Sequence, residues 1–255
     1  TATGLLALAA CSDSSVPLDS DAPRFAAASP RVIPPSASPL GRPYREWSAA
    51  WWKWAWGTPA SISAVLDATG DRCASGQGDR VWFLAGSFST DPVERHCTIP
   101  VGRPLLFPII NVAWGAFLND PPETRTEEFM RAQLTCVEAA ELAASIDGVP
   151  VTNLKQYLEK SMLFDVQLPA DNVLGLTADV VPQLLLSPTV DEGYYLIVMP
   201  LAPGSHTLRW SAAACGFTQD ITYHLTVRGR EVIGDGPSSV QSRGCCPNAL
   251  TIWGT

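Results

Sequence analysis

Five tryptophans lie within ten residues, and this cluster constrains the fold more than any other feature of the chain. They are Trp47, Trp51, Trp52, Trp54 and Trp56. Of the 255 residues, 46% are hydrophobic and only 16% are charged, against roughly 25% charged in an average globular domain. A chain of this composition can bury a sizeable core, so global disorder is excluded.

The segment 44–56 is predicted to form a helix, because Pro43 suits a first turn and Gly57 stops it. At 100° per residue, three indoles share the inward arc: Trp47, Trp51 and Trp54. Trp52 and Trp56 lie at the margin of that arc. The favoured interpretation is that the whole stripe packs as core.

The alternative interpretation is an aromatic platform for a ligand. Trp52 and Trp56 are one helical turn apart, and Trp114 could add a third ring. Aromatic faces stack on sugar rings or polymer surfaces at low entropy cost. This alternative predicts contact with a glycan or another envelope polymer.

Seven cysteines indicate an oxidising compartment, because the chain has no C-x-x-C motif and its three histidines are scattered. One of them, Cys11, follows a short apolar run. The other six are predicted to form disulfides: Cys73, Cys97, Cys136, Cys215, Cys245 and Cys246. Cys73 and Cys97 flank one predicted strand and form the best local pair. Cys136 and Cys215 are then expected to bond the adjacent cysteines at 245–246.

The first residues resemble the end of a signal peptide. The tetrad Leu8-Ala9-Ala10-Cys11 resembles the lipobox of bacterial lipoproteins, which implies that Cys11 carries a lipid. An ordinary secretory signal is the alternative. Residues 12–43 hold seven prolines and seven serines and are predicted to be a disordered tether. Residues 44–255 are then expected to form a single globular domain with a stapled C-terminal tail.

Strand patterns dominate the rest of the chain. Short apolar or alternating runs occur at 81–85, 105–110, 162–168, 194–199, 206–210 and 221–227. Asp147-Gly148 predicts a hairpin turn. A second helix is expected over 124–144, with Thr124 and Glu127 as a capping box, and a short one at Asn153. The predicted fold is mainly β: an antiparallel β-sandwich, jelly-roll or Ig-like, with two or three packed helices.

Candidate chemistry is sparse. Glu46 and Asp120 are weak candidates for the paired carboxylates of a glycosidase-like hydrolase. His206 and His224 are expected on opposite sheet faces, and His96 at the start of a strand, so no metal site is predicted. Asp67 and the neighbouring acid at 71 only faintly resemble a calcium loop. No cofactor motif occurs, and a net charge of −8 argues against nucleic acid.

Several short motifs also resemble a family of uncharacterised secreted bacterial proteins with a Trp-rich N-terminal helix. The motifs are Glu46-Trp47-Ser48, Trp51-Trp52-Lys53-Trp54, Val81-Trp82-Phe83-Leu84-Ala85-Gly86, Cys97-Thr98-Ile99-Pro100, Gly204-Ser205-His206-Thr207 and Thr222-Tyr223-His224-Leu225-Thr226. The resemblance covers roughly residues 44–228. It implies secretion and a common fold, and it assigns no catalytic residue.

These patterns together predict an extracytoplasmic binding or structural module of the cell envelope, held at the membrane only through a lipid anchor. A secreted hydrolase and a protein–protein scaffold remain the alternatives. An exposed apolar patch of several hundred Å² would indicate the scaffold.

Overall fold

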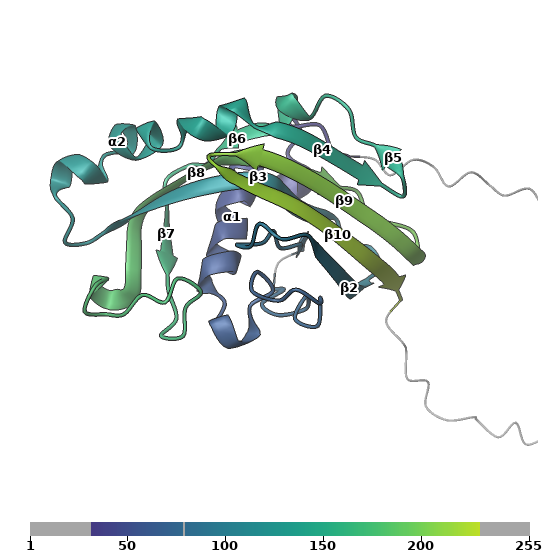
Figure 1. Ribbon diagram of the computed structural model, residues 1–255, viewed down its shortest axis with the longest axis horizontal. Coiled ribbons are helices and arrows are strands. Elements are labelled where there is room, and N and C mark those ends of the chain that lie inside the picture. The colour runs from purple at the N-terminus through teal and green to yellow at the C-terminus, as the bar shows by residue number, and fades with distance from the viewer. Residues whose placement is uncertain (1–31, 79, 230–255) are drawn as a thin grey trace, which may run out of the picture.

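The computed structural model of the protein describes residues 32–78 and 80–229. They form a mainly β structure with two α-helices and two mixed sheets in a sandwich-like arrangement (Figure 1). The strands are β1 (Trp82–Phe83), β2 (Val93–Pro100), β3 (Leu105–Phe117), β4 (Glu141–Ile146), β5 (Val149–Pro150), β6 (Leu158–Lys160), β7 (Phe164–Gln167), β8 (Leu185–Val198), β9 (Gly204–Ala214) and β10 (Phe217–Arg228). The helices are α1 (Tyr44–Gly57) and α2 (Glu127–Ala132). Short 3-10 turns are η1 (Pro39–Gly41), η2 (Ala60–Ile62), η3 (Pro122–Arg125), η4 (Thr135–Ala139), η5 (Leu154–Tyr157) and η6 (Pro182–Leu184).

Each sheet contains one parallel pair of strands. The first sheet has the order β1-β3-β8-β6, with β7 also paired to β8, and the second has the order β2-β10-β9-β4-β5. The pairs β1–β3 and β2–β10 are parallel, and the others are antiparallel. The prediction of a wholly antiparallel sandwich is therefore wrong in these two pairs, because long connections return β2 and β10 in the same direction.

One hydrophobic core joins the two sheets. Phe107 of β3 stacks on Trp210 of β9 with ring centroids 4.5 Å apart. Trp210 in turn stacks on Tyr223 of β10 at 5.6 Å. These rings point inward because alternate residues of a strand face the same side.

One local prediction about strands is confirmed. β4 and β5 form the expected hairpin, in which Asp147 and Gly148 both have positive φ, as a type I′ turn requires. The ladder between β3 and β8 shifts its register next to Pro108, which has no N–H group to donate to a ladder.

Helix α1 lies against the concave side of the sheet that contains β3 and β8, and α2 lies on the opposite side (Figure 1). The boundaries of α1 agree with the prediction to within one residue, except that Pro43 is the N-cap rather than part of the first turn. Loops before and after the helix cover the sides that the sheet leaves free. The helix is therefore surrounded by protein on most of its circumference.

The predicted long helix over 124–144 is wrong. The structure has η3, the six-residue α2 and η4 in its place, and Thr126 rather than Thr124 caps α2 by accepting the N–H of Phe129. Residues after Ala140 pair with β9 as β4. This pairing in the tertiary structure outweighs the helical preference of a segment rich in Ala and Glu. The short helix expected near Asn153 is the single turn η5.

The folded region begins earlier than residue 44. Val32 forms a β-bridge with Val198, and the carbonyl oxygen of Ile33 accepts a hydrogen bond from the Tyr44 hydroxyl. Residues 32–43 are thus packed on the domain and are not part of a tether. Residues 12–31, Cys11 and the proposed lipobox lie outside the described residues.

Two disulfides join Cys73 to Cys97 and Cys136 to Cys215. The first confirms the predicted local pair. The second corrects the prediction that Cys136 and Cys215 bond the cysteines at 245–246, which lie outside the described residues. Disulfides are consistent with an extracellular protein. Among the described residues, no helix has the length and hydropathy needed to cross a membrane.

Candidate functional site

All five clustered indoles are buried. Their exposed fractions run from 0% for Trp47 to 7% for Trp54 and Trp56. Four of the indole N–H groups donate hydrogen bonds: Trp47 to Pro39 O, Trp51 to Leu84 O, Trp52 to the Tyr195 hydroxyl and Trp54 to Ser75 O. The helix therefore organises the core, and the interpretation of the stripe as core is confirmed.

The exposed platform proposed for Trp52, Trp56 and Trp114 does not form. Trp52 is 5% exposed and packs on Trp56 with ring centroids 4.4 Å apart. Trp114 is 39% exposed and lies against Phe129 of α2, on the other face of the sheet. Trp52 instead donates its indole N–H to Tyr195 of β8, so this margin of the helix meets the sheet.

Trp52 nevertheless forms part of the wall of a pocket. A cavity of about 200 Å³ lies between α1, the segment after β1, β3 and the tip of the β9–β10 hairpin. Its lining is mostly apolar and includes Trp51, Trp52, Phe88, Ile110, Val112 and Phe217. Phe88, which is 46% exposed, is the most exposed of these rings.

Gln219 is one of the residues that line this pocket, and its buried amide oxygen is unsatisfied. Its side chain is 7% exposed, and no group among the described residues donates a hydrogen bond to its Oε1. A Cβ atom at position 86 would lie 3.0 Å from this oxygen, so the glycine there leaves room for the amide. A buried polar atom without a partner is costly unless a ligand or water completes its hydrogen bonding.

A chain of hydrogen bonds leads from the pocket to a buried acid. Asn111, which lines the pocket, donates from Nδ2 to the Tyr195 hydroxyl at 2.9 Å, and Trp52 donates to the same hydroxyl at 3.0 Å. Tyr195 donates to Asp191, which also accepts a bond from Ser48. Burial raises the pKa of Asp191 to about 6, although its hydrogen bonds act in the opposite direction. This network fixes Asn111 and Trp52 on the pocket side.

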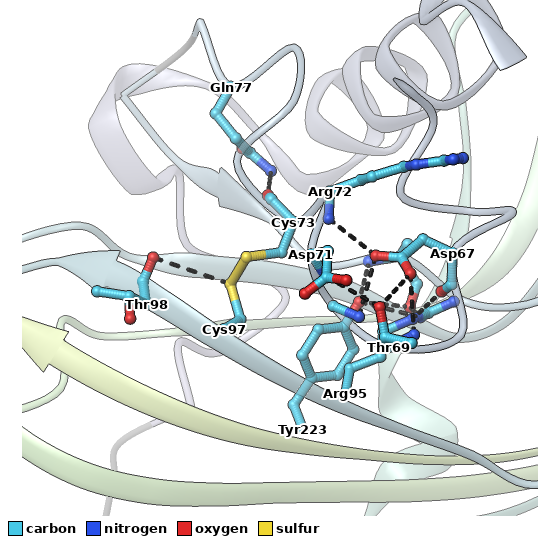
Figure 2. The surroundings of a disulfide bond; sticks show 12 residues. Asp67, Thr69, Asp71, Arg72, Cys73, Gln77, Arg95, Cys97, Thr98 and Tyr223 are labelled. Carbon is cyan, nitrogen blue, oxygen red and sulfur yellow. Dashed lines mark hydrogen bonds between the residues drawn. A yellow bond between two sulfur atoms is a disulfide. The ribbon is translucent and has the colours of Figure 1, made fainter. Parts of the chain in front are cut away.

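Arg95 holds the segment that forms another wall. Its buried guanidinium donates to Ala85 O, Gly86 O and the Tyr223 hydroxyl, and its Nε donates to Asp67 O. Figure 2 shows Arg95 between the Asp67 loop and Tyr223, close to the Cys73–Cys97 disulfide. One cation thereby joins β2, β10, the Asp67 loop and the segment at the pocket.

The second disulfide holds the remaining wall. Cys215 lies at the tip of the β9–β10 hairpin and lines the pocket, and its bond to Cys136 ties the tip to η4. Cys215 has φ of +55° and the next residue, Gly216, has φ of +73°, as a two-residue hairpin turn requires. The pocket is therefore built on fixed elements.

The Asp67 loop uses its carboxylate internally. Asp67 Oδ1 accepts bonds from Thr69, and Oδ2 accepts the N–H groups of Gly70 and Arg72. Burial alone raises the pKa of Asp67, but these hydrogen bonds together hold it below the ordinary value. The carboxylate serves as an anchor for the loop, which explains its resemblance to a calcium loop.

Glu46 and Asp120 are each engaged within their own segments. Glu46 of α1 pairs with Arg42, which precedes the helix, at 3.5 Å, and Asp120 accepts the N–H of Phe117 at 2.7 Å. Neither carboxylate lines the pocket of Trp52. No hydrogen bond or ion pair joins the two acids in the described part of the chain.

The histidines divide as strand parity predicts, with one correction. His206 pairs in register with Leu225, and His224 with Thr207, so their side chains leave opposite faces. His96, however, lies in the middle of β2 and pairs in register with His224. The two imidazoles stack with centroids 4.8 Å apart.

Fold and pocket together define a disulfide-bonded, mainly β protein with a small apolar pocket. No protein-family model matches the chain, and no curated protein matches it. Three solved structures show distant similarity. They are PbICP-C in complex with falcipain-2 (10% identity, 59% of this chain and 100% of that chain, TM-score 0.25), Amebosin (9%, 54% and 96%, 0.20) and the cysteine protease inhibitor EhICP2 from Entamoeba histolytica (12%, 52% and 86%, 0.19). At these TM-scores the similarity supports no inference about function.

Proposed function

We propose that the protein is an extracytoplasmic binding module whose pocket takes one ring-sized group with a hydrogen-bond donor. The observation that carries this proposal is Gln219, a lining residue of a mostly apolar pocket whose buried Oε1 has no hydrogen-bond partner among the described residues. Sites of this kind combine apolar walls with a few placed polar groups. Catalysis is not required by any contact described above.

The size of the pocket limits the ligand. A cavity of about 200 Å³ is smaller than the roughly 300–1,000 Å³ of pockets for larger ligands. A dry cavity of about 150 Å³ already holds benzene in another protein. The proposed occupant is therefore a single ring, either free or at the end of an envelope polymer.

The amides of Asn111 and Gln219 determine where on the ligand ring the hydrogen-bond donor must lie. Asn111 is held by Tyr195, and Gln219 is held against Gly86, so both amides have fixed positions. An apolar ring between Trp51 and Phe217 would then direct a hydroxyl or N–H group to Gln219 Oε1. A sugar ring has one apolar face and is the second candidate ligand, in keeping with the glycan hypothesis.

Attachment to the cell envelope is a separate part of the proposal and rests on Leu8-Ala9-Ala10-Cys11. Expression of the full precursor in a bacterial host with a labelled fatty acid tests it. Label is expected in the natural sequence and is lost in Cys11→Ser. Unlabelled protein in both cases would reject the anchor while leaving the pocket proposal standing.

Phenol and toluene test the pocket, because they have similar shape and only phenol carries a donor. Binding of each is measured by ¹H–¹⁵N NMR of the indole N–H signals, with N-acetylglucosamine as the sugar probe. Phenol is expected to shift the Trp51 and Trp52 signals at lower concentration than toluene does. Loss of the Gln219 hydrogen bond should cost about 0.5–1.5 kcal/mol of phenol binding.

Gln219→Met keeps the volume of the side chain and removes its amide. It is expected to reduce the preference for phenol over toluene, while Thr218→Val, on the exposed side of β10, leaves the preference unchanged. If none of the three probes shifts these indole signals, the pocket is not a binding site. Equal effects of phenol on natural protein and Gln219→Met would reject the role of Gln219.

A further inference from the structure

A second cluster of polar side chains lies on the outer face of the β2–β10 pair, apart from the pocket. Parallel pairing sets His96 opposite His224 and Glu94 opposite Thr222, so both histidines and Glu94 leave the same face. The two imidazoles are 4.8 Å apart and nearly parallel, at 19°. His224 Nε2 lies 2.6 Å from Glu94 Oε1.

Three potential ligand atoms therefore converge. One atom from each of Glu94, His96 and His224 lies within 4.8 Å of the other two. Zinc–nitrogen bonds of about 2.0–2.1 Å place two ligands of a tetrahedral ion roughly 3.4 Å apart. To bind such an ion, the most distant of the three ligand atoms must move closer to each other by on the order of 1 Å. Small rotations of these partly exposed side chains can supply that movement.

The backbone beneath the cluster is fixed on both sides. The Cys73–Cys97 disulfide (Figure 2) attaches next to His96, and the N–H of His96 donates to Thr69 O at 2.8 Å. On the other side β10 is paired along its length with β9. Ligands carried by such a frame lose little freedom on binding an ion.

The surroundings admit a cation. The hollow around the two rings is lined by hydroxyl groups of Thr98, Ser205, Thr207 and Thr226, and no lysine or arginine is among its lining residues. Arg209, in the register row of Thr222, is paired with Asp220 at 3.0 Å. The charge of this neighbouring arginine is thus already paired.

We propose that Glu94, His96 and His224 form a binding site for a borderline divalent ion, with Zn²⁺ as the best fit. Two imidazoles and one carboxylate suit such an ion, whereas calcium and magnesium require more oxygen ligands. Three protein ligands leave a fourth position open to water. This site is independent of the pocket described above, and either can fail without the other.

Calorimetric titration of the full chain with Zn²⁺ tests the proposal. One ion is expected to bind per chain. His96→Ala, His224→Ala and Glu94→Gln are each expected to weaken binding by at least about tenfold. His206→Ala is the matched control, because both ring nitrogens of His206 are engaged, by Asp147 and Ala202 O, on the opposite face.

Cobalt(II) as a spectroscopic substitute keeps the test decisive if a variant folds poorly. In the natural sequence Co²⁺ is expected to shift and broaden the imidazole signals of His96 and His224 much more than those of His206. A thiolate-to-cobalt charge-transfer band would assign the ion to free cysteines and overturn the proposal. It would also be overturned if Zn²⁺ binds no tighter than millimolar, or if Zn²⁺ affinity is equal in the natural chain and all three variants.

Discussion

The guanidinium of Arg95 donates a hydrogen bond to the hydroxyl of Tyr223 at 3.0 Å, and each side chain is 1% exposed. The remaining donors of Arg95 go to backbone carbonyls, and no carboxylate is bonded to it among the described residues. A buried cation is tolerated only when its donors are satisfied. The hydrogen bonds of Arg95 therefore hold three segments in place: the Asp67 loop, residues 85–86 and β10 at Tyr223.

Replacement of Arg95 is expected to destabilise the fold strongly. Arg95→Met removes the guanidinium donors of the Asp67 and Gly86 carbonyls and leaves Ala85 O only the bond from the Tyr223 hydroxyl, at a cost of roughly 3–5 kcal/mol in the free energy of unfolding. Urea denaturation measures this cost. Arg72→Met, at an exposed position of the same region, should cost well under 1 kcal/mol. Similar losses in the two variants would contradict the proposed role of Arg95.

A conservative change at the same position separates stability from binding. Arg95→Lys keeps the charge but lacks the fork of donors that reaches Ala85 and Gly86. We expect a folded protein with weaker phenol binding, because the segment beside Gln219 loses its anchor. Unchanged phenol affinity in a folded Arg95→Lys protein would show that this anchor does not position the pocket.

Gly70 is expected to tolerate no side chain. It has φ of +96°, and a Cβ atom there would lie 2.3 Å from the backbone oxygen of His96. Gly70→Ala should therefore lower the free energy of unfolding by more than about 1 kcal/mol. Gly78→Ala, where a Cβ meets nothing within 4 Å, is the control and should be nearly neutral. Thermal unfolding of both variants checks this, and equal midpoints would refute it.

How much of the fold the sequence predicts depends on the range of the interactions. The helix over 44–56 and the Asp147-Gly148 hairpin follow from local chemistry, and both form as expected. The parallel pairing of β2 with β10 joins segments more than a hundred residues apart, and no local pattern encodes it. The helix expected over 124–144 fails in part for the same reason, since β9 pairs with its last residues, from Glu141 onward, as a strand.

The candidate sites show the same limit. Periodicity places Trp52 at the margin of an apolar arc, but the ring is buried because its indole N–H reaches Tyr195 of β8 and its ring packs on Trp56. Gln219 and Asn111 occur in ordinary strand sequences, so their convergence on a pocket has no signal in the chain. The opposite faces of His206 and His224 follow from strand parity, whereas the meeting of His96 with His224 requires the long-range register.

Loss of the Cys136–Cys215 disulfide should affect both stability and binding. The bond closes a loop with a sequence separation of 79, for which chain entropy gives about 4.5 kcal/mol. Cys136→Ser with Cys215→Ser is expected to lose stability of this order in urea and to bind phenol more weakly, because the hairpin tip forms one pocket wall. The pair Cys73→Ser with Cys97→Ser, with a separation of 24, should lose about 3 kcal/mol and retain phenol binding. Equal phenol affinities in both double variants and the natural chain would contradict this.

Asp191 makes stability depend on pH in a direction that is unusual for an acid. Burial raises its pKa from 3.8 to about 6. Between these values the folded protein holds a proton that the unfolded chain has released, so stability falls as pH rises, by up to about 1.4 kcal/mol per unit. Asp191→Asn cannot titrate, so the difference in free energy of unfolding between natural protein and variant should change across this window and level off above it. Urea denaturation from pH about 4 to about 7 measures the difference, with exposed Asp165→Asn as control. A constant difference for Asp191→Asn would show that Asp191 titrates alike in both states.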